Sequence, residues 1–171
     1  MDVMNAVLAR RSIRRYQNRP IEESVLTKVL EAGRLAPSAR NEQDWRFIVV
    51  TDANLRAKMV DACLGQSFIQ DAPVHLVVCA NNARDMACGQ PARTVDCSIA
   101  LSFMMLEAVE CGLGTCWLGS FDNQAVKALL HIPGDYQVVA VTPLGYPGEE
   151  VNPRPRKSLD QVIAYDDRWV K

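Results

Sequence analysis

The sequence is poor in histidine and in aromatic side chains, and its cysteines lack the spacing of a metal site. Only two histidines occur among 171 residues, and Phe, Trp and Tyr together make up 6% of the chain. The cysteines are Cys63, Cys79, Cys88, Cys97, Cys111 and Cys116, with no Cys-x-x-Cys pair among them. Zinc and iron–sulfur sites use closely spaced ligands. The pattern therefore argues against a metal centre and predicts reduced, mostly buried thiols.

Long apolar runs and an excess of charge of either sign are also missing. Nineteen Lys and Arg side chains balance 20 Asp and Glu, which leaves a net charge of −1 and argues against nucleic acid or a polybasic membrane anchor as a partner. The apolar run over residues 99–109 is interrupted by Ser102 and Glu107 and is far shorter than the roughly 20 residues that cross a bilayer. The N-terminus places Asp2 before its arginines, the reverse of a secretory signal. We therefore expect a cytoplasmic protein without a membrane span.

The sequence does contain enough apolar residues for one packed core. They make up 49% of the chain against 23% charged residues, which is typical of soluble globular proteins. A length of 171 residues corresponds to about one domain. No linker, low-complexity segment or internal repeat divides it. We expect a single domain over residues 1–171.

Helix and strand signals alternate along this domain. Apolar periodicity and capping residues predict helices over residues 2–10 and 22–35, after Asp52, over 95–111 and 122–130, and a short one after Ser158. Continuous apolar stretches predict strands over residues 47–50, 74–79, 115–118 and 138–141. Residues 95–111, with Ile99, Phe103, Leu106 and Val109 at helical spacing, predict the central buried helix, which Gly112 ends. Wholly apolar strands predict an α/β-type domain whose sheet is covered by helices on both faces.

Basic side chains gather near the two ends of the chain. The first 20 residues contain the single acid Asp2 and five arginines, Arg10, Arg11, Arg14, Arg15 and Arg19. Guanidinium groups beside Ser12 suit a dianionic phosphate, because charge-assisted hydrogen bonds are about twice as strong as neutral ones. A solvated basic face is the alternative. A second cluster, Pro-Arg-Pro-Arg-Lys over residues 153–157, is positioned to converge with the first on one anion.

Two further segments are candidates for binding a flat ligand. Residues 36–47, Ala-Pro-Ser-Ala-Arg-Asn-Glu-Gln-Asp-Trp-Arg-Phe, form a polar loop in which Asn41 and Gln43 offer donors and acceptors to a heteroaromatic edge. An ordinary connecting loop has the same composition. Residues 112–119, Gly-Leu-Gly-Thr-Cys-Trp-Leu-Gly, are glycine-rich but lack Gly-x-Gly-x-x-Gly or Walker spacing, so helix termination and tight packing also explain them.

Taken together and in this order, the four segments resemble the nitroreductase family of flavin enzymes over nearly the whole chain. The resemblance rests on Arg-Arg-Ser-x-Arg, on Ala-Pro-Ser-x-x-Asn-x-Gln-x-Trp-x-Phe, on a long helix closed by Gly-Leu-Gly-Thr-Cys-Trp, and on Gly-Tyr-Pro followed by Arg-Pro-Arg-Lys. It implies an α/β (α+β) fold with a central, mostly antiparallel sheet flanked by helices. It also implies a homodimer whose two chains share each FMN site. The chain is similar to the short members, without the long helical insertions of larger relatives.

The resemblance also implies a set of cofactor-binding positions and no catalytic side chain. These positions are Arg10, Arg11, Ser12, Arg14, Pro37, Ser38, Ala39, Asn41, Leu118, Gly119, Arg156 and Lys157. Arg10, Arg11 and Ser12 would hold the FMN phosphate together with Arg156 or Lys157. Arg14 would lie near flavin N1 and O2. Those from 37 to 41 would reach the isoalloxazine from the partner chain, and the backbone at 118–119 would face flavin N5.

Three features depart from the family pattern. Some larger relatives place a second cation near the flavin pyrimidine, but no Lys or Arg occurs here between Lys58 and Arg84, and Gln66 is a weak substitute. Arg40 stands where small or neutral residues are common, and Asp44 replaces a frequent proline. Both substitutions lie where they would alter access of the substrate to the flavin.

The function expected from the resemblance is that of an FMN-dependent oxidoreductase. It would accept hydride from NADH or NADPH and reduce a small organic acceptor, of nitroaromatic or quinone type, by a ping-pong mechanism. Dehalogenation, dehydrogenation and flavin breakdown are alternatives on the same scaffold. A non-enzymatic thiol or metal sensor, or an anion-binding module, is the alternative from a different class.

Overall fold

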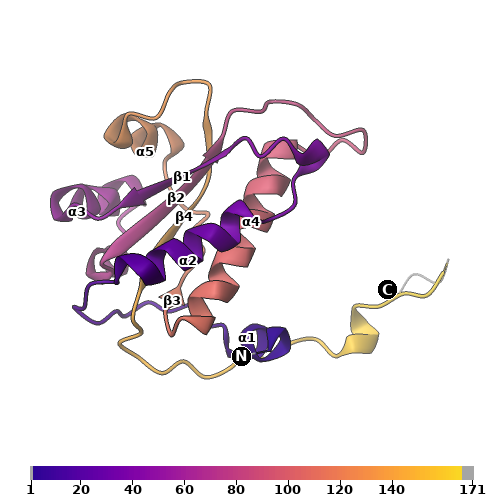
Figure 1. Cartoon of the computed structure of the whole chain (residues 1–171), viewed down its shortest axis with the longest axis horizontal. Coiled ribbons are helices and arrows are strands. Elements are labelled where there is room, and N and C mark those ends of the chain that lie inside the picture. Colours follow the sequence, from indigo (N-terminus) through magenta and orange to yellow (C-terminus); the bar gives the residue numbers. More distant parts are fainter. Residues whose placement is uncertain (1, 167–171) are drawn as a thin grey trace.

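Strand β2 (Val74–Ala80) lies at the centre of the fold, and all seven of its residues are buried. In the computed structural model, which describes residues 2–166, β2 pairs with β1 (Trp45–Val50) on one side and with β4 (Gln137–Gly145) on the other. The short strand β3 (Gly114–Thr115) pairs with the far edge of β4. The order is β1-β2-β4-β3, and every pairing is antiparallel, as the family resemblance implied (Figure 1).

Two layers of helices cover the two faces of this sheet. Helices α2 (Glu23–Arg34) and α4 (Ala92–Glu110) pack on the face that carries Leu76 and Val78. Helices α3 (Ala53–Ala62) and α5 (Asn123–Leu130) pack on the face that carries Val77 and Cys79. Because side chains alternate between the faces of a strand, both sides of β2 are apolar. The continuous apolar strands predicted that helices cover both faces of the sheet, and this prediction is confirmed.

The remaining elements are short. They are α1 (Val3–Ala9) and the 3₁₀ helices η1 (Ala39–Asn41), η2 (Ser67–Asp71) and η3 (Leu159–Gln161). Asp2, Asp52 and Asp122 cap α1, α3 and α5, since each carboxylate accepts a backbone N–H of its own helix. Ser158 opens η3 through a capping box with Gln161.

Helix α4 is the longest helix and has apolar residues on two sides. The side that packs on the sheet and on α2 consists of Cys97, Ala100, Leu101, Met104 and Ala108, all fully or almost fully buried. The predicted stripe faces elsewhere: Phe103 is 43% exposed, and Ile99, Leu106 and Val109 are half-buried. The helix is central, as predicted, and Gly112 follows it with a φ of 72°. An additional apolar side is a surface on which another chain can pack.

All six cysteines are free, and four of them are buried. Burial raises the pKa of the Cys97 thiol to about 12 and that of Cys63 to about 11. These thiols are protonated at neutral pH and behave as small apolar groups. Among residues 2–166, no group of three His, Cys, Asp or Glu side chains is arranged to hold a metal ion, and no helix has the length and apolar character of a membrane span.

After β4 the chain leaves the body of the molecule. Residues 151–166 run past α1 and extend outward as an arm (Figure 1). Leu159, Val162 and Tyr165 on this arm are 62–73% exposed. The arm therefore presents apolar side chains that its own chain does not cover.

Candidate functional site

The basic segment after α1, residues 10–15, is held against the edge of the sheet. The Ile13 N–H donates to the Thr115 carbonyl oxygen at 2.9 Å, and Ser12 forms a parallel bridge with Thr115. Tyr16 is buried behind the segment, and its hydroxyl donates to the Ile13 carbonyl oxygen at 2.7 Å. Burial raises the pKa of Tyr16 far above its usual range. These contacts fix the backbone that carries the arginines.

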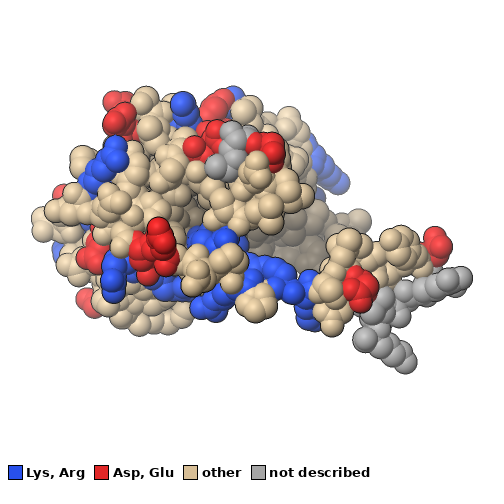
Figure 2. Space-filling model, turned by 90° about the horizontal axis from the view of Figure 1, so that it is seen from below, with Lys and Arg blue, Asp and Glu red and all other residues tan. Residues whose placement is uncertain are grey.

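The two basic clusters line one pocket. Its volume is about 310 Å³, and its polar lining consists of Arg10, Arg11, Ser12, Arg14, Asn152, Arg154 and Arg156. Arg11 connects the two ends of the chain, because its Nε donates to the Val151 carbonyl oxygen at 3.1 Å. Seen from below, Lys and Arg side chains gather along this part of the surface and toward the arm (Figure 2). Lys157 does not line the pocket.

The chemistry of this pocket, which we call the arginine pocket, fits a phosphate dianion. Five arginines contribute to the lining, and no Asp or Glu lines it among residues 2–166. The nearby Glu149 instead accepts a hydrogen bond from the Arg14 backbone N–H at 2.7 Å. Ser12 adds a hydroxyl donor, and Thr115 Oγ1 beside it is buried without a hydrogen-bond partner in the described residues. Charge-assisted hydrogen bonds from several guanidinium groups are the usual means of binding phosphate.

Leu118 and Gly119 follow β3 in the chain, and Leu118 lies beside β4. Leu118 exchanges hydrogen bonds with Val141, N to O at 2.9 Å and O to N at 3.4 Å. A Cβ built on Gly119 would meet no atom within 4 Å. Gly119 therefore borders open space, as Gly134 does.

Gln66 lies close to this backbone but makes structural contacts. Its Nε2 donates to the Cys63 carbonyl oxygen at 3.0 Å and to the Ser120 carbonyl oxygen at 2.7 Å. The amide thereby ties η2 to the segment after β3.

The other predicted part of the site, residues 37–43, begins after α2 and contains η1. Arg40, Asn41 and Gln43 have φ values of 55°, 56° and 52°, which is the left-handed region. Non-glycine residues in this region cost on the order of 1–3 kcal/mol each unless their surroundings hold them there. The Gln43 N–H donates to Ser38 Oγ at 3.1 Å and closes the loop.

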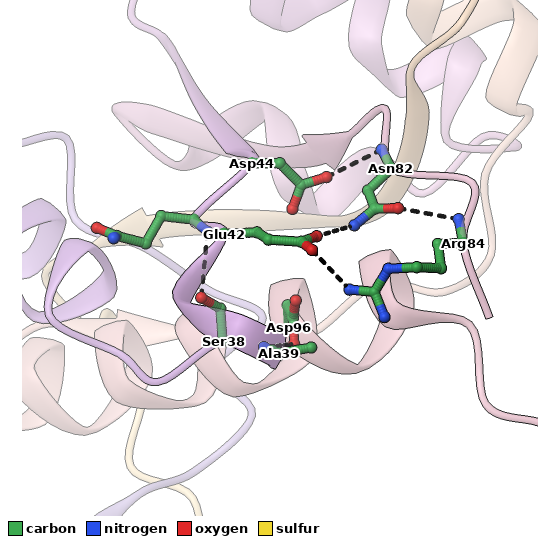
Figure 3. A network of polar contacts seen from close by, with 8 residues as sticks. Ser38, Ala39, Glu42, Asp44, Asn82, Arg84 and Asp96 are labelled. Atoms are coloured by element: carbon green, nitrogen blue, oxygen red, sulfur yellow. Dashed lines mark hydrogen bonds and ion pairs between the residues drawn. The ribbon is translucent and has the colours of Figure 1, made fainter. Parts of the chain in front are cut away.

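A network of polar contacts surrounds this loop (Figure 3). Asp96 on α4 accepts a hydrogen bond from the Ala39 N–H at 3.0 Å. Glu42 accepts a hydrogen bond from Asn82 Nδ2 and pairs with Arg84 at 3.0 Å. These contacts connect residues that lie about 40 to 60 positions apart in the chain. No local sequence pattern predicts these contacts; a carboxylate at Asp96 within a mostly apolar helix is the one signal of them in the sequence.

The basic segment over residues 10–15 and the 37–43 loop lie toward opposite ends of α4 (Figure 1). Asp96, near the start of the helix, contacts the loop, whereas residues 112–114 after its end lie beside Ile13. At 1.5 Å per residue, α4 rises about 21 Å from Asp96 to its last residue, Glu110, and Arg10 borders Ser102 and Met105 part-way along it. In one copy of the chain, the 37–43 loop does not line the arginine pocket.

Comparison with known proteins identifies the family. The model of the nitroreductase family matches residues 7–67 and 63–146, and the two matches overlap at residues 63–67. The chain belongs to the nitroreductase family. The basic segment and the 37–43 loop both fall within the matched residues, whereas Arg154 and Arg156 lie beyond them.

Relatives within the nitroreductase family cover almost the whole chain. A Thermus thermophilus protein named NADH dehydrogenase is 33% identical, with 96% of each chain covered. The FMN reductase [NAD(P)H] of Bacillus subtilis is 28% identical over 94% of this chain and 72% of its own length. A solved FMN-dependent nitroreductase from Clostridium difficile superposes with a TM-score of 0.83 at 28% identity and covers 97% of this chain and 99% of its own. The nitroreductase fold is thereby confirmed.

Proposed function

We propose that this chain is an FMN-dependent oxidoreductase that takes hydride from NADH or NADPH and reduces a small organic acceptor of nitroaromatic or quinone type. The names of its relatives support the enzyme class and the cofactor. The observation that carries the proposal is the arginine pocket, in which five arginines from both ends of the chain meet Ser12. Six free thiols support the proposal that the protein works in a reducing compartment such as the cytoplasm.

The residues of this chain bind and orient the cofactor. When bound, FMN supplies hydride chemistry that no amino-acid side chain offers. Arg10, Arg11 and Ser12 hold the phosphate together with Arg156, while Arg14 offers a cation to the pyrimidine edge and stabilises negative charge there. Lys157 remains a weaker candidate for the phosphate because it lies outside the pocket lining. Gly119, beside the buried Leu118, borders the space proposed for the reactive edge of the ring.

We further propose that each site is completed by a second copy of the chain. In this arrangement Pro37, Ser38, Ala39 and Asn41 of one copy contact the isoalloxazine held by the arginine pocket of the other. The distance between these groups along α4 supports the arrangement.

Uncovered apolar surface supports a homodimer independently. On α1, Val3, Met4, Val7 and Leu8 are 48–76% exposed, and Val3 lines a groove of about 500 Å³ together with Phe103 and Leu106 of α4. The exposed residues of the C-terminal arm add to this surface. Exposed apolar area on this scale is typical of a surface that another chain covers.

The absorption spectrum of the purified protein tests the proposal. A flavin spectrum, with FMN released on denaturation, is expected, followed by bleaching when NADH or NADPH is added without oxygen. Acceptors are then screened, and product analysis distinguishes reduction from dehalogenation, dehydrogenation or flavin breakdown. A colourless protein that takes up no added FMN, or one that contains iron or zinc, would overturn the proposal.

A further inference from the structure

The 37–43 loop is held in its left-handed conformation by contacts within the loop and by contacts from outside it. Three of its residues have positive φ although none is glycine. Hydrogen bonds within the loop join Asn41 N to Ser38 O, Glu42 N to Ala39 O, Gln43 N to Ser38 Oγ and Gln43 Nε2 to Asn41 O, and none of them uses the Ala39 N–H. That N–H donates to the carboxylate of Asp96, 57 positions further along the chain.

Asp96 is an unusual residue for its place in the fold. It is 2% exposed on a helix whose other buried side chains are apolar or thiol groups. Asp96 is not the N-cap of α4, since Pro91 occupies that position. Its carboxylate oxygen therefore accepts a hydrogen bond from the loop and does not cap its own helix. Its second oxygen, Oδ2, is buried without a hydrogen-bond partner in the described residues. A carboxylate in such surroundings is costly, because a buried charge without full compensation destabilises the fold.

A second anchor holds the other end of the loop. Glu42 binds Asn82 and Arg84, and the Asn82 N–H donates to Asp44 Oδ2 at 2.9 Å. The Ala92 N–H at the start of α4 donates to the Arg84 carbonyl oxygen at 3.0 Å. The loop is thus fixed at Ala39 by α4 directly and at Glu42 through the segment that leads into α4. Both anchors depend on the first half of the same helix.

We propose that Asp96 is the positioning residue of the site: by accepting the Ala39 N–H, it holds the strained 37–43 loop so that Asn41 meets the flavin bound by the partner chain. This inference rests on the proposed function. Asp96 acts only through the loop, because its carboxylate is buried and bonded to the loop backbone. The cost of burying it is thereby explained by the geometry that it gives the site.

Three variants test this role. Asp96→Ala removes the acceptor, Asp96→Leu removes it while filling more of the space, and Asp96→Asn keeps an acceptor oxygen. Asp52→Ala is the control: the Asp52 carboxylate also accepts a backbone N–H, that of Leu55 at 2.8 Å, but it caps α3 and is separated from the loop by the length of β1.

The first measurement is made on the FMN-free protein. Arg40 provides a trypsin site within the loop, so the rate of cleavage after Arg40, relative to cleavage elsewhere in the chain, reports the local order of the loop. We expect this relative rate to rise at least tenfold in Asp96→Ala and Asp96→Leu, and to stay within about threefold of the wild type in Asp96→Asn and Asp52→Ala. A general loss of stability would raise cleavage everywhere and leave the ratio unchanged. Unchanged relative cleavage in both the Ala and Leu variants would overturn the inference.

The second measurement is made on the FMN-loaded protein. The same two variants are expected to bind FMN at least tenfold more weakly and, at saturating FMN, to lower kcat and shift the flavin absorption bands, with Asp96→Asn restoring all three. If the loop opens but FMN affinity, spectrum and kcat match the wild type, Asp96 does not position the site, although the proposed function stands. If the wild type itself binds no FMN, the proposed function fails and the flavin part of this inference fails with it, while the cleavage ratio still decides whether Asp96 holds the loop.

Discussion

The protonation of Asp96 is also coupled to folding. Burial raises the pKa of its carboxyl group, and the charges of Asp44 and Glu42 raise it further, against the opposing effects of the Ala39 N–H and Arg84. A group with a raised pKa in the folded state favours folding below its unfolded pKa, and this contribution is lost as the pH rises through the folded pKa. At neutral pH the ionised Asp96 therefore destabilises the protein.

Replacing this charge is expected to stabilise the fold at neutral pH. Asp96→Asn should melt at a higher temperature than the wild type at pH 7, and the gain should shrink as the pH falls toward about 4, the usual range for an aspartic acid. Thermal melts between pH 4 and 7.5 check this expectation. Asp52→Asn at the exposed cap of α3 is the control and should show no such gain. A constant difference at every pH would contradict the explanation.

Arg10 tests the arginine pocket at the same scale. Arg10→Ala is expected to weaken FMN far more than riboflavin, because riboflavin has no phosphate for the guanidinium group to bind. Loss of one charge-assisted hydrogen bond is worth roughly 1.5–3 kcal/mol, or about 10- to 150-fold in affinity.

Titration of both flavins into the FMN-free protein measures the Arg10 effect. Arg34→Ala removes the same charge from an exposed ion pair with Glu31 on α2 and serves as the control. Equal losses of affinity for the two flavins would show that Arg10 does not bind the phosphate.

At the scale of elements, β3 supports the basic segment from behind. A Cβ on Gly114 would lie 2.5 Å from Cγ1 and 2.9 Å from Cβ of Ile13. Gly114→Ala must therefore displace Ile13. The backbone N–H of Ile13 donates to β3, and Ile13 lies between Ser12 and Arg14 in the chain. Overpacking of this kind costs about 1–3 kcal/mol.

We accordingly expect Gly114→Ala to lower both the free energy of unfolding and the affinity for FMN. Denaturant titration and flavin titration measure the two effects. Gly134→Ala is the matched control, because a Cβ at Gly134 meets no atom within 4 Å and its φ is not positive. A Gly114→Ala protein that keeps wild-type FMN affinity would show that the basic segment does not depend on β3.

The elements themselves could be predicted from the sequence because their signals are local. Asp2, Asp52 and Asp122 lie directly before the helices they cap, and the apolar stretches over 47–50, 74–79 and 138–141 lie within strands. The strand predicted over 115–118 was wrong in extent: β3 is Gly114–Thr115, and Leu118 forms only an isolated bridge with Val141. The side of α4 that faces the sheet could not be predicted, because apolar residues occur on both sides. Its small residues pack against the sheet and α2, and the larger Phe103 remains on the exposed side.

The candidate site could be predicted only in part for a related reason. The basic clusters over residues 10–19 and 153–157 were expected to converge from their charge alone. Arg10, Arg11, Arg14, Arg154 and Arg156 do line one pocket, whereas Arg15, Arg19 and Lys157 do not line it. The anchors of the 37–43 loop were not expected, since Asp96, Asn82 and Arg84 follow no local pattern. Positive φ at Arg40, Asn41 and Gln43 was equally invisible, because glycine is the residue that normally marks it.

At the scale of the whole molecule, the proposed site can be tested by mixing two inactive variants. Arg10→Ala damages the arginine pocket and Asn41→Ala damages the loop. In a mixed dimer, one site contains both lesions and the other contains neither. If pairing is random in a twofold dimer, half the dimers are mixed and half their sites are intact, so roughly a quarter of native activity should return.

The comparison requires that each parent be poorly active alone. The two variants are unfolded together, refolded, and assayed beside each parent treated in the same way, with mass or tag evidence that mixed dimers formed. Activity that stays at the average of the parents would place Arg10 and Asn41 in the site of a single chain.

The length of α4 has a consequence for how the protein becomes active. In the proposed dimer, one copy alone holds only half of the contacts of each site, because the basic segment lies toward one end of this helix and the 37–43 loop toward the other. A cofactor that touches both copies would link its own binding to their association by mass action, so each would favour the other. Dilution would then release flavin as well as separate the chains, and a shortage of flavin would loosen the pair. Assembly would in this way switch electron transfer on, and loss of the pair would switch it off.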